Sequence, residues 1–106
     1  MNATRPIPTV LLAMVLVHAP AALLAERINY KDGGYYEGQT LNGKAHGFGT
    51  LYYAPDNPDK LLKYTGQFHM GKQQGTGTLW WRVGERHTGQ FVDGWISGRG
   101  TRWYSG

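Results

Sequence analysis

Residues 64–81 read YTGQFHMGKQQGTGTLWW, and their spacing of four glycines recurs in the segments before and after them. Residues 36–53 read YEGQTLNGKAHGFGTLYY and residues 87–104 read HTGQFVDGWISGRGTRWY, with no gap inside any unit. The repeat glycines are Gly38, Gly43, Gly47, Gly49, Gly66, Gly71, Gly75, Gly77, Gly89, Gly94, Gly98 and Gly100. A fixed internal period indicates a repeat architecture, in which each unit packs mainly against its neighbours.

Each unit has the pattern of a β-hairpin. Tyr64, Gly66 and Phe68 alternate with polar residues, Gly71 marks a turn, and a return strand is expected over residues 76–82. We therefore predict an all-β fold, a single-layer antiparallel meander of repeated hairpins. The repeats are assigned to residues 36–63, 64–86 and 87–106, after a partial capping strand and turn in residues 26–35. A turn-rich insertion at residues 54–60 lengthens the first unit.

Side-chain shape suggests how the two strands of a hairpin pair. We expect Tyr64 opposite Trp81, Gly66 opposite Leu79 and Phe68 opposite Gly77. Every large side chain would then cover either a glycine or another ring. Regular glycine inside strands indicates close approach by the backbone or by a ring lying over bare main chain.

The pattern Tyr-x-Gly-x-aromatic-x-x-Gly-x-x-x-Gly-x-Gly resembles the MORN (membrane occupation and recognition nexus) repeat. Three positions depart from it: Thr40 replaces the second aromatic residue, His87 the leading tyrosine, and Arg102 the leucine of the other units. The resemblance implies a non-catalytic binding or scaffold module that contacts protein or a membrane surface.

Residues 1–25 differ in composition and have the order of a secretory signal peptide. Arg5 precedes an apolar run at residues 9–17, and small residues follow around Pro20. We expect an N-terminal helix that directs export to the periplasm or exterior, with cleavage after Ala25 or, as an alternative, after Ala21. The other interpretation is an uncleaved membrane anchor over residues 7–25.

Composition narrows the chemistry of the chain. Its 106 residues allow one domain, the absence of cysteine excludes thiolate chemistry, and a net charge of +4 without a basic cluster argues against nucleic-acid binding. The histidines His46, His69 and His87 occupy three different repeat positions, so no common histidine row is expected. We predict no enzyme activity, no cofactor and no metal site.

Surface aromatic and basic residues remain as binding candidates, since exposed rings rimmed by cations are typical of interaction sites. We expect a protein partner or an anionic lipid surface, and as an alternative a carbohydrate held by exposed tryptophans. The edge strand around residues 100–105 also suggests self-association. The candidate residues are Trp80, Trp95, Trp103, Lys72, Arg82, Arg86, Arg99 and Arg102.

Overall fold

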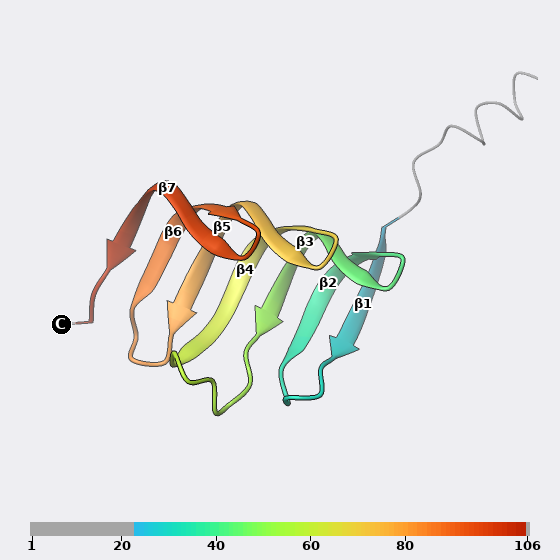
Figure 1. Ribbon diagram of the computed structural model, residues 1–106, viewed down its shortest axis with the longest axis horizontal. Coiled ribbons are helices and arrows are strands. Elements are labelled where there is room, and N and C mark those ends of the chain that lie inside the picture. Colours follow the sequence, from blue (N-terminus) through green and yellow to red (C-terminus); the bar gives the residue numbers. More distant parts are fainter. Residues whose placement is uncertain (1–22, 106) are drawn as a thin grey trace, which may run out of the picture.

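The computed structural model describes residues 23–105, which form one antiparallel sheet of seven strands in sequence order (Figure 1). This arrangement confirms the predicted all-β meander. The strands are β1 (Leu24–Asn29), β2 (Tyr35–Leu41), β3 (Lys44–Tyr52), β4 (Leu61–His69), β5 (Lys72–Trp81), β6 (Arg86–Val92) and β7 (Trp95–Trp103).

The hairpins β2–β3, β4–β5 and β6–β7 close through two-residue turns. At the turn between β4 and β5, Met70 and Gly71 have φ of 46° and 93°, and the other two turns also have positive φ at both positions. Such values define the type I′ turn, whose twist matches that of the paired strands. Figure 1 shows these hairpin ends bending over at the top of the sheet, and the longest connection, between β3 and β4, at the bottom.

Strand β1 pairs with the edge of β2 that is not paired with β3. Glu26 pairs with Gly38 and Ile28 with Tyr36. The strand begins at Leu24, so its first two residues fall within the predicted leader, whose residues 1–22 lie outside the described part of the chain. Across residues 23–105, no helix is long and apolar enough to cross a membrane.

The predicted hairpin register is wrong by two residues at Tyr64 and by four at Phe68, which pairs with Gln73 rather than Gly77. Tyr64 pairs with Leu79 rather than Trp81, and Gly66 pairs with Gly77. Because the turn occupies only residues 70–71, β5 begins at Lys72, before the predicted start of the return strand at residue 76. A β-bulge between Gly66 and Phe68 then changes the pairing by two residues within the hairpin. A shift by an even number of residues leaves every side chain on its predicted face.

The corrected register aligns six repeat glycines across six strands. The row runs Gly38, Gly49, Gly66, Gly77, Gly89 and Gly100. A Cβ placed on Gly77 would lie 2.5 Å from Cε2 of Tyr64, and one on Gly49 would lie equally close to Tyr36. Rings therefore cover bare main chain as expected, but the ring is the leading tyrosine of the same unit rather than the phenylalanine.

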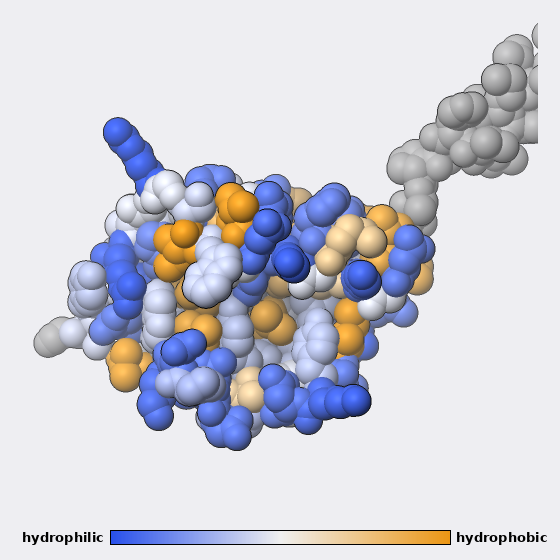
Figure 2. Space-filling model, viewed as in Figure 1, coloured by the Kyte–Doolittle hydropathy of each residue, from blue (hydrophilic) through white to orange (hydrophobic). Residues whose placement is uncertain are grey.

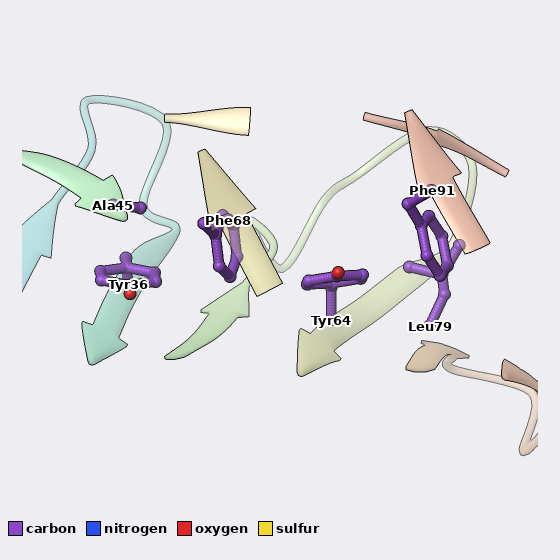
Figure 3. Packing of buried hydrophobic residues seen from close by; sticks show 6 residues of the cluster. All are labelled: Tyr36, Ala45, Tyr64, Phe68, Leu79 and Phe91. Atoms are coloured by element: carbon purple, nitrogen blue, oxygen red, sulfur yellow. The ribbon is translucent and has the colours of Figure 1, made fainter. Parts of the chain in front are cut away.

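The buried side chains gather on one side of the sheet, which we call the core face. Tyr36 packs edge-on against Phe68 at 4.9 Å between ring centroids, and Tyr64 packs against Phe91 at the same distance. Figure 3 shows these rings, with Ala45 and Leu79, following one another from strand to strand. Edge-to-face contacts between successive units thus hold the array together.

Candidate functional site

The side of the sheet opposite the core, which we call the flat face, carries a row of rings and cations. Register places Tyr35, Tyr52, Lys63, Trp80, Arg86 and Trp103 next to one another on six successive strands. We call this set the cation–aromatic row.

Direct contacts link neighbours within the cation–aromatic row. The Tyr35 and Tyr52 rings stack at 4.5 Å between centroids. Nζ of Lys63 lies 4.7 Å from the centroid of Trp80, and the guanidinium carbon of Arg86 lies 4.1 Å from that of Trp103. These cations therefore cover one side of each tryptophan ring, which limits its availability for stacking with a ligand.

A second row on the flat face consists of threonines. Thr50, Thr65, Thr78, Thr88 and Thr101 are neighbours on five successive strands. Hydroxyl groups of Thr50 and Thr65 are 3.0 Å apart, and those of Thr78 and Thr88 are 2.8 Å apart. The threonine row makes the centre of the flat face polar and shallow.

The core face contains an uncovered groove. One cavity of about 530 Å³ is lined by residues that include Tyr53, Leu79, Trp81 and Trp95. A second cavity of about 260 Å³ shares Tyr53 with the first and extends toward the β1–β2 turn. Figure 2 shows apolar residues in the middle of the molecular face and hydrophilic residues along its lower margin.

Trp95 is the most exposed large hydrophobic residue in the described part of the chain. Its exposed fraction is 77%, and it stands at the start of β7 beside Ile96, which is 41% exposed. Both residues line the larger cavity together with Asp59 and Arg102. The groove thus offers an apolar floor with one acid and one cation on its lining.

The structure divides five of the predicted binding residues between the cation–aromatic row and the groove. Trp80, Trp103 and Arg86 belong to the flat face, whereas Trp95 and Arg102 line the groove. Arg102 also lies over Trp81 at 4.0 Å and forms an ion pair of 3.0 Å with Glu85.

The remaining three predicted cations lie apart from both groups. Arg82 donates a hydrogen bond of 3.2 Å to the carbonyl oxygen of Ala54. Lys72 pairs with His69 beside a hairpin turn, and Arg99 is exposed on β7. No single surface therefore includes all eight candidates.

Sequence reasoning missed several residues that matter for these surfaces. Lys63 and Arg27 belong to the flat face, where Arg27 lies 3.8 Å from the ring centroid of Tyr35, and Tyr53 joins the two cavities. Strand alternation contained a signal for Lys63, which precedes Tyr64 and so points to the opposite face. Its partner Trp80 followed only from the correct register.

Two histidines come together although their repeat positions differ. The rings of His46 and His69 are 4.9 Å apart between centroids on neighbouring strands, which corrects the expectation that the histidines share no row. His46 Nδ1 accepts a hydrogen bond of 3.1 Å from the Met70 N–H, which gives this ring a role in joining hairpin ends. Within residues 23–105, no three metal-binding side chains cluster.

Comparison with known proteins gives one family match. A family model described as MORN repeat matches residues 36–57, 64–86 and 87–106. No curated protein matches the chain. The matched segments coincide with the three hairpins β2–β3, β4–β5 and β6–β7 and their connections.

Proposed function

Because the chain belongs to the MORN repeat family, we propose that it is a non-catalytic module that binds a segment of a partner protein in the groove of its core face. The observation that carries this proposal is the exposed Trp95 beside a cavity of about 530 Å³. Large apolar side chains at the rim of a preformed pocket are the usual centre of protein interfaces.

The chemistry of the groove defines the kind of segment that fits. Leu79, Trp81 and Ile96 supply an apolar lining, and Asp59 and Arg102 supply one charge of each sign. The matching segment carries an apolar anchor flanked by polar residues. A tryptophan buries roughly 150 Å² or more in an interface, which corresponds to about 4 kcal/mol of transfer free energy before the costs of association.

Site-specific photocrosslinking in cells of the native host tests the groove. A photoreactive phenylalanine analogue at position 95 is expected to capture a partner, whereas the same analogue at position 103, on the flat face, serves as the matched control. The captured protein is then purified and titrated against the full chain. We expect Trp95→Ala to weaken binding at least tenfold and Trp103→Ala to leave it unchanged; equal affinity for the two variants would refute the groove.

A membrane surface is the second candidate, favoured by the charge of the flat face. Arg27, Lys63 and Arg86 all project there, and Phe48 on the same face is 62% exposed. Each cation near an anionic surface adds about 1 kcal/mol. Cosedimentation of the protein with anionic vesicles at low salt tests this function. If the flat face binds the membrane, Lys63→Glu should bind the vesicles more weakly than the native chain. Absence of binding by the native chain at low salt contradicts the function.

A carbohydrate partner remains the weaker alternative. Lys63 and Arg86 already cover one side of the Trp80 and Trp103 rings, so Trp95 is the tryptophan best placed to stack on a sugar. Titration with cell-wall glycans would then change tryptophan fluorescence in the native chain but not in Trp95→Ala. An unchanged signal in the native chain argues against glycan binding.

We also propose that the protein acts outside the cytoplasm after removal of its leader. Strand β1 supports cleavage after Ala21 rather than Ala25, because Leu24 and Ala25 pair with Thr40 and Gln39. Cutting after Ala25 would remove both pairs. N-terminal sequencing of protein from the native host should show a start before Leu24; a start at Glu26 would contradict the site, and a retained Met1 would favour the anchor.

A further inference from the structure

The outer edge of β7 is exposed, and the junctions between the repeats show which kind of strand pairs with such an edge. Eight of the nine residues of β7 are exposed, and within residues 23–105 only β6 pairs with this strand. Its counterparts in the first two units, β3 and β5, each pair on the corresponding side with the leading strand of the next unit. A free strand edge presents unpaired backbone donors and acceptors to an incoming chain.

The two internal junctions show what such an edge accepts. Gly49 of β3 pairs with Gly66 and Leu51 pairs with Tyr64. At the next junction, Gly77 of β5 pairs with Gly89. The corresponding residues of β7 are Gly100 and Arg102, so the same geometry places a glycine opposite Gly100 and an aromatic residue opposite Arg102.

The aromatic contacts between units end at His87. Tyr36 and Tyr64 each pack against a phenylalanine of the following unit at 4.9 Å. His87 holds the same repeat position, is only 8% exposed, and its Nε2 is the one buried side-chain polar atom without a hydrogen-bond partner among residues 23–105. In the repeat geometry, a phenylalanine on an added strand would reach the His87 ring across Gly100.

The charge on β7 indicates which residue the incoming strand carries opposite Arg99. Arg99 and Arg102 are exposed on this strand, which has no acidic residue. Arg102 is already paired with Glu85. The residue equivalent to Arg99 in β5 is Thr76, which pairs with Gln90. An acid at the glutamine position of the incoming strand would therefore face Arg99.

A second copy of this chain does not supply such a strand. Its β2 is already paired on the relevant side with β1, and Thr40 stands where the phenylalanine is required. The Thr40 hydroxyl also donates to the Glu26 carboxylate, which fixes β1 in place. The two edge strands β1 and β7 of a second copy lack the aromatic-x-Gly-x-Phe spacing as well. We therefore assign the incoming strand to another protein.

We propose that the outer edge of β7 binds, by antiparallel strand addition, a partner-protein strand of the pattern aromatic-x-Gly-acid-Phe. The glycine lies opposite Gly100, the phenylalanine packs against His87, and the acid pairs with Arg99. Backbone pairing supplies affinity in this mode, and the alternate side chains supply specificity. The groove shares Arg102 of β7 with this edge, so the two binding roles are distinguished by the amide signals that shift in the titration.

A peptide titration of the full chain tests the edge. The probe has the sequence of residues 63–69 with glutamate in place of Gln67, and its control also has alanine in place of Phe68. We expect the probe to shift the backbone amide signals of Arg99 and Thr101 in nuclear magnetic resonance spectra, and the alanine control to bind at least tenfold more weakly.

A charge exchange identifies the role of Arg99. Arg99→Glu should lower the affinity for the glutamate probe about two- to fivefold, the range expected for an exposed ion pair. A probe with arginine in place of this glutamate should restore the affinity of the Arg99→Glu variant. Lys44→Glu, an exposed change on β3, is the matched control and should leave binding unchanged. No binding at millimolar probe, equal binding of the alanine control, no effect of the charge exchange, or signal shifts confined to Tyr53 and Trp95 would each overturn the proposal.

Discussion

Replacing Gly77 by alanine tests whether the fold depends on a ring lying against bare main chain. A Cβ at this position would lie 2.5 Å from Cε2 of Tyr64 and still closer to its hydroxyl, whereas ordinary contacts begin near 3.4 Å. The ring must therefore retreat by about 1 Å in a packed site. Tyr64 is completely buried and lies between Phe68 and Phe91, so neighbouring rings resist this movement.

The expected cost combines two terms. Overpacking of a well-packed core costs about 1–3 kcal/mol. Displacement of the ring also breaks the 2.9 Å hydrogen bond that the Tyr64 hydroxyl donates to the Gln67 carbonyl, worth about 1 kcal/mol. We expect Gly77→Ala to lower the free energy of unfolding by about 2–4 kcal/mol, a large share of the roughly 4–12 kcal/mol typical of a domain of this size.

Urea unfolding followed by tryptophan fluorescence measures this loss. Thr76→Ala, an exposed change on the adjacent residue of β5, is the control and should shift stability by less than about 0.5 kcal/mol. Adding Tyr64→Leu to Gly77→Ala removes the clashing ring, so the double variant should be at least 1 kcal/mol more stable than the sum of the single effects predicts. A Gly77→Ala variant within 0.5 kcal/mol of the native chain, or additive effects in the double variant, would refute the ring-over-glycine packing.

Three further predictions follow from contacts of the same units. Burial raises the pKa of Tyr36 and of Tyr64 to about 12, so their contribution to stability is complete below pH 10 and is lost as the pH rises from about 10 to 12; melting temperatures should fall across that interval, and a flat profile would contradict it. Gln67→Ala removes the acceptor of a 2.7 Å hydrogen bond from the Thr76 N–H and should cost about 1 kcal/mol in urea unfolding, whereas Gln90→Ala, which loses only an exposed side-chain bond, should cost less than half of that. Tyr64→Phe should cost about 1 kcal/mol in the same assay, because it removes only the hydroxyl bond to Gln67; an unchanged midpoint would show that this bond contributes nothing.

The repeat pattern alone was sufficient to predict the class of fold. Four glycines at constant spacing, with Tyr64 and Phe68 in alternation, predicted three hairpins in one antiparallel sheet, and the seven strands confirm this. Local rules control such features: alternation fixes which side of a strand a residue faces, and glycine marks the tight turns.

The pairing between strands required the tertiary structure. A type I′ turn at Met70 and Gly71 and a bulge after Gly66 set the register, and both depend on long-range packing as much as on composition. The sequence named Trp80 and Trp95 as one set of candidates, but the structure places Trp80 in the cation–aromatic row and Trp95 at the groove. Residues distant in sequence become neighbours only when the register is fixed. For this reason the covering of Trp80 by Lys63, the groove beside Trp95 and the unpartnered His87 near the edge of β7 were decided by the assembled sheet.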